Sequence, residues 1–426
     1  MIAILAVTFV GLIILGVPIA FGMLASTALA MLAGGSLPLP LIAQRVGAGV
    51  DNFTYLAIPL FILAGTIMEQ SGISARLVAL ARALVGHIHG GVGQVVIVSE
   101  LFFSGISGAS LSDASAIGSI MYPTLRRAGY EEGRAVALIA AACAMGILIP
   151  PCLTMVVLGA LAGVSVGALF VAGFLPGLLM AVALMILVYV QARRGTLPAG
   201  EIRATRGEVW TAFRGAILPL MLPVIIFGGI LGGVFSPTEA AAVAVLYAFV
   251  VAAIVYRELS LAAMYEVLVQ TATITGSIGL VLGAAAAFAS LLGLEGIPSQ
   301  VAEAVVGFSK NPLVFLILAN LIFLLFGALL DGIPALLLFI PILMPVASVL
   351  GIDPLHFTLV SVASLGVGLV LPPIGIMLLV LCSVTGVPIA TVSRAMGPYL
   401  IILGVCLLVM MALPAVVLVV PRALGF

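Results

Sequence analysis

The chain has 426 residues, of which 64% are hydrophobic and only 7% are charged, with 15 basic and 15 acidic side chains and no net charge. Charged residues make up about a quarter of soluble chains, so a soluble globular fold is excluded and the lipid bilayer must be the solvent. The balanced charge also excludes the basic patch that a nucleic-acid partner requires.

The first apolar stretch covers residues 2–33, and residues 2–31 carry no charge. This stretch is longer than the apolar core of a secretory signal peptide, so we predict that it is retained as a membrane span. Because apolar segments recur along the chain, the sequence predicts a multi-pass, all-α integral membrane protein. The later segments lie at 54–69, 91–103, 133–149, 152–162, 167–191, 215–233, 237–256, 262–292, 312–330, 355–371 and 398–420.

Charged residues border the first of these segments. Residues 74–86 place Arg76 and Arg82 among leucines at helical spacing, which favours an amphipathic helix at the membrane surface over a solvated loop. Glu69 and Glu100 stand close to the ends of apolar segments, so both are expected at the membrane interface.

Residues 104–122 are rich in glycine and serine, which favours a re-entrant helical hairpin over a full span. Within this segment Asp113 stands among several serines, including Ser107 and Ser110. An acid at the centre of a bilayer costs roughly 2.5–3.5 kcal/mol on insertion scales, so Asp113 needs a partner. Hydroxyl, carboxylate and carbonyl oxygens suit an alkali cation or a proton. The structural alternative is a serine-rich face that packs against another helix.

The next apolar segment is interrupted between Gly146 and the adjacent prolines Pro150 and Pro151. Proline lacks an amide donor and pushes the residue before it out of the helical region, so carbonyl groups lose their partners. In hydrocarbon such carbonyls are tolerated where they line a cavity or face protein. We therefore expect a broken helix at 133–162, with main-chain oxygens exposed at the break.

The connection 191–214 gathers charges in the middle of the chain, and the positive-inside rule predicts that it is a cytoplasmic linker. Trp210 marks the return to the membrane, since aromatic side chains favour the interface. Farther on, Ser236 and Glu239 have the spacing of a capping box at a helix start. The basic residues of the linker are Arg193, Arg194, Arg203, Arg206 and Arg214.

The second half of the chain repeats the proline break. Subtracting 150 from 372 and 146 from 368 gives 222 in both cases, so Pro372 and Gly368 match Pro150 and Gly146. Paired Gly/Pro interruptions in two halves are the best sequence indication of a transporter's binding site. The predicted first repeat is 1–190, with a hairpin at 104–122 and a broken helix at 133–162, followed by the linker 191–214. The predicted second repeat is 215–426, with a hairpin at 326–349 and a broken helix at 355–386.

The sequence lacks the motifs of common enzymes. The three histidines, His87, His89 and His356, form no metal-binding motif, and no glycine-rich phosphate loop occurs. The GxSxG-like string around Ser107 lacks the strand–turn–helix setting of a hydrolase nucleophile. We therefore predict that the protein is not an enzyme and uses no transition metal and no organic cofactor, and that an ion gradient supplies its energy.

Seven short stretches in order along nearly the whole chain carry a family resemblance: 56–65, 86–91, 107–118, 146–151, 236–242, 351–357 and 371–375. Together they resemble the large membrane subunit of the TRAP (tripartite ATP-independent periplasmic) transporters. The resemblance implies two inverted structural repeats, each with a re-entrant hairpin and a broken helix. It also implies an elevator-type transporter in the bacterial inner membrane.

The function that the resemblance implies is import of a small organic acid, often a carboxylate, with Na+ as the coupling ion. The implied partners are a small four-helix membrane subunit and a periplasmic substrate-binding protein that delivers the substrate. Segments 104–162 and 326–386 would form one transport unit that slides against a scaffold. The alternative is an ion-gradient-driven exporter or antiporter of similar architecture that works without a binding protein.

The family's ion sites can be transferred to this chain residue by residue. The first site would use Ser107, Asp113, Gly146, Ile149 and Pro151. The second site would use Gly327, Gly368, Leu371 and Pro373. The candidate substrate contacts are Ser110, Pro150, Pro372 and Asp331. A helix N-cap is an equally good interpretation of Asp331.

Two positions beside the proline pairs depart from the family pattern. Cys152 follows the first pair where the family commonly has a hydroxyl, and Leu371 precedes the second pair where threonine is common. Because Leu371 has no hydroxyl, the second ion site either is weakened or is completed by main-chain carbonyls.

Overall fold

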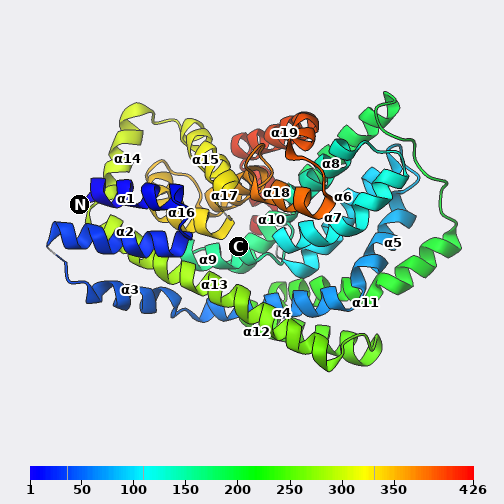
Figure 1. Cartoon of the computed structure of the whole chain (residues 1–426), viewed down its shortest axis with the longest axis horizontal. Coiled ribbons are helices and arrows are strands. Elements are labelled where there is room, and N and C mark those ends of the chain that lie inside the picture. The colour runs from blue at the N-terminus through cyan, green and yellow to red at the C-terminus, as the bar shows by residue number, and fades with distance from the viewer. Residues whose placement is uncertain (36, 109, 331) are drawn as a thin grey trace.

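The structure is a computed structural model that describes residues 1–35, 37–108, 110–330 and 332–426. Throughout these ranges the chain is built from helices, which pack around a centre where α9, α17 and α18 lie (Figure 1). Eight helices in these ranges are long and apolar enough to cross a membrane, as the composition predicts. They are Phe53–Gln70, Val166–Arg193, Arg206–Leu231, Pro237–Val255, Leu261–Leu294, Pro312–Leu329, Gly332–Val349 and Ile389–Ala412.

The first apolar stretch forms two helices, so the prediction of a single span is wrong. α1 (Ile2–Ile14) and α2 (Ile19–Gly34) pack against each other as a hairpin. Between them Gly16 has a φ of +79°, which glycine tolerates, and Pro18 has no amide hydrogen with which to continue the helix. Each helix is too short to cross about 30 Å of hydrocarbon alone.

The next helices form one flank of the molecule. α3 (Pro40–Val50) packs along α13, and a short 3₁₀ turn, η1 (Phe53–Leu56), leads into α4 (Ala57–Gln70). α5 (Ile73–Val85) confirms the helix predicted for this region. Its buried face includes Leu77 and Leu80 and packs against α6 and α11.

The first repeat continues with a helical hairpin and a broken helix. α8 is buried at every residue from 135 to 146, because its many alanines allow neighbouring helices to approach closely. The hairpin is longer than the predicted 104–122, because its first arm, α6, already begins at Gly91. The helices are α6 (Gly91–Ser107), α7 (Ser110–Arg127), α8 (Glu132–Gly146), α9 (Leu153–Ala162) and α10 (Val166–Arg193).

The second half begins with four helical elements. The capping box predicted at Ser236 is confirmed, because the Ser236 amide donates to the Glu239 carboxylate at 2.7 Å and the Glu239 amide donates to the Ser236 hydroxyl at 3.3 Å. Figure 1 shows α13 running past α2 and α3, with which it packs. The elements are α11 (Arg206–Leu231), α12 (Pro237–Phe249) with its π-helical extension η2 (Val250–Val255), α13 (Leu261–Leu294) and α14 (Ile297–Phe308).

A second hairpin and a second broken helix follow, in the order seen in the first half. This hairpin is also longer than predicted, because its first arm begins at Pro312 and not at residue 326. The helix before the break is again buried, here from His356 to Gly368. The helices are α15 (Pro312–Leu329), α16 (Gly332–Val349), α17 (Pro354–Gly368), α18 (Ile376–Thr385), α19 (Ile389–Ala412) and α20 (Ala415–Ala423).

The two halves interlock at the centre. α9, which follows the first break, packs on α16 of the second hairpin, and α18, which follows the second break, packs on α7 of the first hairpin. Gly118 of α7 allows this contact, because a Cβ atom there would lie 2.8 Å from a methyl group of Leu381. The two breaks are therefore held in one central region by reciprocal contacts.

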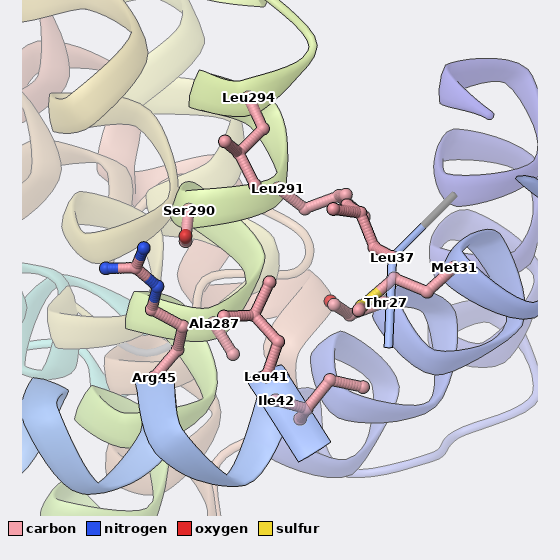
Figure 2. A pocket seen from close by; sticks show the side chains of 10 residues that line it. All are labelled: Thr27, Met31, Leu37, Leu41, Ile42, Arg45, Ala287, Ser290, Leu291 and Leu294. Atoms are coloured by element: carbon pink, nitrogen blue, oxygen red, sulfur yellow. The ribbon is translucent and has the colours of Figure 1, made fainter. Parts of the chain in front are cut away.

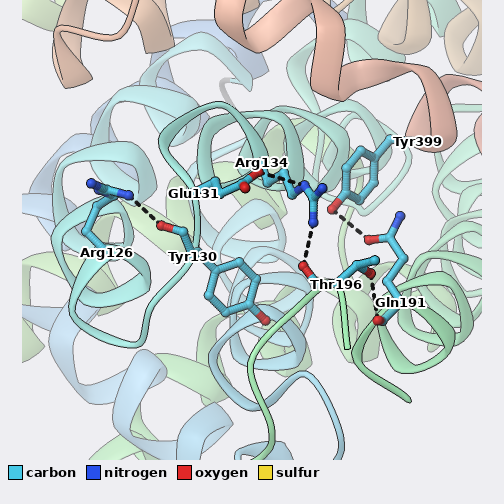
Figure 3. A network of polar contacts seen from close by, with 7 residues as sticks. All are labelled: Arg126, Tyr130, Glu131, Arg134, Gln191, Thr196 and Tyr399. Atoms are coloured by element: carbon cyan, nitrogen blue, oxygen red, sulfur yellow. Dashed lines mark hydrogen bonds and ion pairs between the residues drawn. The ribbon is translucent and has the colours of Figure 1, made fainter. Parts of the chain in front are cut away.

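A polar network at one end of the first repeat joins α8, α10 and α19 (Figure 3). Arg134 of α8 donates to the carbonyl of Thr196, which follows α10. The Tyr399 hydroxyl of α19 donates to the side-chain oxygen of Gln191 at 3.3 Å. These bonds fix the start of the broken helix against helices from both halves. The residues drawn are Arg126, Tyr130, Glu131, Arg134, Gln191, Thr196 and Tyr399.

Candidate functional site

The first helix break is buried and exposes main-chain oxygens to the protein interior. α8 ends at Gly146, whose carbonyl accepts from the Ile149 amide at 2.9 Å, and the Pro150–Pro151 peptide is cis. Residues 147–152 are all buried. Among the described residues no donor reaches the carbonyls of Ile149, Pro150 and Pro151. Because buried carbonyls are rarely left unpaired, these three oxygens indicate a place for a cation, water or substrate.

The tip of the first hairpin lies directly on this break. A Cβ atom on Gly108 would lie 2.7 Å from the Pro151 carbonyl oxygen, and the φ of Gly108 is +66°, so contact and conformation both require glycine. A Cβ atom on Gly105 would lie 3.6 Å from the Pro150 carbonyl oxygen. The amide of Leu153 in turn donates to the Gly108 carbonyl at 3.2 Å. The hairpin therefore closes over the break through backbone contacts.

Asp113 is brought to the same region by the first turn of α7. Its side chain is 1% exposed and lies near the thiols of Cys143 in α8 and Cys152 at the break. The amino end of a helix favours a carboxylate in this position. Its neighbour Ser112 donates to both carboxylate oxygens of Glu69 in α4, at 3.0 and 3.2 Å. The carboxylate that the sequence singles out thus lies beside the first break.

Glu100 is a second buried carboxylate, and its predicted position at the membrane interface is wrong. Its side chain is 0% exposed because α6 begins at Gly91 and places Glu100 in its middle. The Ser104 hydroxyl donates to its Oε1 at 2.9 Å. Both groups lie against Gly146, where a Cβ atom would come within 2.5 Å of Oε1 and 2.3 Å of the Ser104 oxygen. The first break is therefore lined by side chains of α6 as well as by its own backbone.

The second break is more open and is packed differently. α17 ends at Gly368, whose carbonyl accepts from the Leu371 amide at 2.9 Å, and the Pro372–Pro373 peptide is again cis. Leu371 and Pro372 are half-buried and Pro373 is exposed. Gly368 contacts the backbone of α15, since a Cβ atom there would lie 2.6 Å from a carbonyl oxygen of that helix and 3.1 Å from the Gly327 Cα. Gly327 and Gly368, two of the residues predicted for the second ion site, are thus in close main-chain contact.

The broken helices cross next to their breaks. A Cβ atom on Gly366 of α17 would lie 2.5 Å from the Ala144 carbonyl oxygen and 2.6 Å from the Ile147 side chain. On the other side of α17 the Ser364 hydroxyl donates to the amide oxygen of Asn320, a buried residue of α15. The helices before the two breaks are therefore in direct contact, and a buried polar pair lies on α17 and α15 in the second half.

Comparisons with known proteins identify the family of this chain. A family model described as the tripartite ATP-independent periplasmic transporter, DctM component, matches residues 6–416. The chain is 38% identical over 417 residues to the sialic acid TRAP transporter large permease protein SiaM of Vibrio cholerae, with 97% of each chain covered. This chain belongs to the TRAP transporter family. It is also 39% identical over 375 residues to the C4-dicarboxylate TRAP transporter large permease protein DctM of Pseudomonas aeruginosa, with 88% of each chain covered.

Solved structures support the fold. The YdaH transporter of Alcanivorax borkumensis matches with a TM-score of 0.58 over 88% of each chain, at 18% identity. As a TRAP large permease, the chain is a multi-pass protein of the bacterial inner membrane and a transporter subunit, and the family and relatives that it matches are transporters, not enzymes. The all-α membrane fold predicted from the sequence is confirmed. The elevator motion stays a prediction.

The residues at the first break fit the sodium ion that the TRAP resemblance implies. Sodium prefers hard oxygen ligands, and the break offers three carbonyls without donors among the described residues, next to Asp113. At the second break the Leu371 carbonyl accepts from the Gly375 amide at 2.9 Å, while no described donor reaches the carbonyl of Pro373. Asp331 and the side chains of Ser107 and Ser110 lie outside the described residues, so their roles stay predictions.

A small cavity between α2, α3 and α13 is a poor alternative site (Figure 2). Thr27, Arg45 and Ser290 are its polar lining residues, and apolar side chains form the rest of the wall. Its volume is about 10 Å³, which is just enough for one water molecule. An organic acid does not fit there, so the breaks are the better candidate.

Proposed function

We propose that this chain is the sodium-coupled permease subunit of a TRAP transporter that imports a small organic acid, in the simplest case a carboxylate. The observation that carries the proposal is the buried first break, where three carbonyls without described donors lie beside Asp113. Its relatives are named for sialic acid and C4-dicarboxylates, which supports an acidic substrate for this chain as well.

Each part of the centre has a role in this mechanism. Asp113 and the carbonyls of Ile149 and Pro151 would hold the first sodium ion, and Gly108 would let the hairpin tip close over it. The carbonyls near Pro373 would hold a second ion. A bound cation would offset the charge of the substrate carboxylate, and the amino ends of α9 and α18 would add the positive ends of their dipoles.

The ion gradient is large enough for this task. One sodium ion that moves down a potential of 100 mV releases about 2.3 kcal/mol. A tenfold concentration ratio adds about 1.4 kcal/mol. Two ions therefore supply roughly 7 kcal/mol for accumulating the solute, without any nucleotide hydrolysis.

The motion that we propose is an elevator. The two hairpins and the two broken helices, which interlock through α9 with α16 and through α18 with α7, would move as one unit. The other helices would form a scaffold together with a small membrane subunit, and a periplasmic protein would deliver the substrate. The family description calls the transporter tripartite, which supports a complex of this chain with two further components.

The decisive experiment reconstitutes the chain with its small subunit in proteoliposomes, with the matching periplasmic binding protein added outside. Uptake of labelled sialic acid and of C4-dicarboxylates is measured under an inward sodium gradient, a potassium gradient and a proton gradient. We expect uptake of one acid under the sodium gradient alone and dependence on the binding protein. Uptake that ignores sodium, or that proceeds without the binding protein, contradicts the proposal and favours the exporter or antiporter alternative.

A further inference from the structure

A groove away from the breaks lies where the linker meets the first repeat. It has a volume of about 480 Å³ and is bordered by the end of α5, the linker and the start of α11. Two alanines line it together with Leu84, His87, Arg203, Arg206 and Val209. None of these residues takes part in the transport mechanism described above.

The groove is positively charged because its two arginines outnumber Glu208, the one nearby acid without a basic partner among the described residues. Arg82 forms two hydrogen bonds of 2.7 Å with Glu201, which neutralises that pair. The Glu208 carboxylate accepts from the amide and hydroxyl of Thr205, at 2.7 and 2.9 Å, in a capping box. Neither Arg203 nor Arg206 has an acidic partner in the part of the chain that the structure describes. Two exposed guanidinium groups are therefore available to an anion.

Two further groups favour an anion in the same place. The Nδ1 atom of His87 is buried and has no hydrogen-bond partner among the described residues. Arg206 is the first residue of α11, so the positive end of the helix dipole adds to the two guanidinium groups. The Glu208 carboxylate on the same turn opposes this attraction, but its bonds to Thr205 hold it in the cap.

The position of the groove indicates which anion it takes. α11 is a candidate membrane span that begins at Arg206, and Trp210 and Phe213 stack with ring centres 5.9 Å apart in its first turns. Both rings are exposed, as are Ile217 and Val224 farther along the helix. Aromatic residues of this kind mark the level of lipid headgroups. The basic groove therefore opens at the membrane surface, next to an apolar helix face along which an acyl chain can lie.

We propose that this groove binds the phosphate of an anionic phospholipid in the cytoplasmic leaflet. Arg203 and Arg206 hold the phosphate oxygens, His87 donates a further hydrogen bond, and Leu84 and Val209 contact the glycerol backbone. Basic pockets beside membrane helices on the cytoplasmic side are known to select such headgroups. α5 leads into the first hairpin, which belongs to the proposed moving unit, whereas α11 belongs to the other half of the chain. The lipid would therefore link α5, beside the moving unit, to the scaffold.

The test uses the purified complex with its small subunit. Native mass spectrometry measures binding of phosphatidylglycerol and, as a neutral lipid, phosphatidylcholine. We expect Arg203→Gln/Arg206→Gln to weaken phosphatidylglycerol binding by roughly 30-fold, the usual effect of losing two basic residues near an anionic bilayer. Phosphatidylcholine binding should stay the same. The matched control is Arg193→Gln/Arg194→Gln, which makes the same change of charge outside the groove and should keep full binding.

Each other result overturns the proposal. Equal weakening in the groove and control variants would show that general surface charge attracts the lipid. Displacement of the lipid by an equal concentration of inorganic phosphate would show that the groove takes a free anion. Should the double variant unfold, Arg203→Gln alone reports on the site, because Arg203 lies in the linker outside any helix. Full phosphatidylglycerol binding in this folded variant would also contradict the assignment.

Discussion

The two proline breaks match in sequence but differ in how the protein surrounds them. At the first break residues 147–152 are buried, and the side chains of Glu100 and Ser104 line it. At the second break Pro373 is exposed, and Gly368 packs against the main chain of α15. The position 222 residues after Glu100 is Ile322, so the second half has no carboxylate there.

This difference shows how one duplicated motif can support two unequal sites. Side chains can supply charge and can be exchanged one at a time, whereas a main-chain site depends on how closely two helices approach. We expect a main-chain site to tolerate a leucine at position 371 in place of the family's threonine, provided that the backbone geometry is kept. We therefore expect the first site to respond most to changes of charge and the second to changes of volume.

The largest expected effect is at Asp113. Asp113→Asn keeps the shape of the side chain but removes its charge, so sodium-driven uptake in proteoliposomes should fall at least about tenfold, the effect of losing about 1.4 kcal/mol of ion binding. Sodium-dependent thermal stabilisation of the purified protein should fall with it. Glu303→Gln, which changes an exposed carboxylate of α14, is the control and should behave as the parent chain. Full sodium-driven uptake in Asp113→Asn would remove this residue from the coupling mechanism.

The second prediction compares alanine at Gly368 with alanine at Gly146. At Gly368 the methyl group would lie 2.6 Å from a backbone oxygen, so α15 and α17 must separate. Overpacking of this kind costs about 1–3 kcal/mol, and we expect a lower thermal unfolding temperature together with loss of uptake. At Gly146 the nearest atoms belong to side chains, the Ser104 hydroxyl at 2.3 Å and Glu100 Oε1 at 2.5 Å.

This difference can be tested with a second substitution that removes the atom that the new methyl group contacts. Ser104→Ala removes the atom closest to the new methyl group, so Gly146→Ala/Ser104→Ala should regain part of the lost thermal stability. A second change cannot relieve Gly368→Ala in this way, because the obstructing oxygen belongs to the backbone of Leu324. If both glycine variants are equally impaired and Ser104→Ala relieves neither, the distinction between a side-chain site and a main-chain site is wrong.

The sequence predicts the breaks well and their surroundings poorly, for a physical reason. A proline pair after a glycine ends a helix whatever its neighbours are, so the interruptions after Gly146 and Gly368 could be read from residue type alone. Glu100 could not be placed in this way, because its burial depends on where α6 begins and on which helices cover it. The same holds for the contact of Asn320 with Ser364, which joins two helices. Gly16 and Pro18 do mark the turn between α1 and α2, whereas the length of the uncharged stretch favours a single span.

The third prediction concerns Glu100 itself. Glu100→Leu removes the acceptor of the Ser104 hydroxyl in a buried place, which typically costs about 1–3 kcal/mol, so the free energy of unfolding should fall. Glu100→Gln keeps an acceptor oxygen of similar shape and should lose less. Thermal unfolding temperatures of the purified variants should follow the order parent, Glu100→Gln, Glu100→Leu, from highest to lowest. Unfolding of Glu100→Leu at the temperature of the parent would show that this carboxylate does not support the first break.

The smallest expected effect is at the polar pair of the second half. Ser364→Ala removes the hydroxyl that donates to the Asn320 side-chain oxygen, while the Asn320 amide still donates to the Leu316 carbonyl at 2.6 Å. Hydrogen bonds between helices in membrane proteins average about 0.6 kcal/mol, so the thermal shift should be small and uptake should persist. A double-mutant cycle with Asn320→Leu isolates the pair, and we expect a coupling energy below that of Glu100 with Ser104. A larger coupling would mean that the second half relies on side-chain polarity as much as the first.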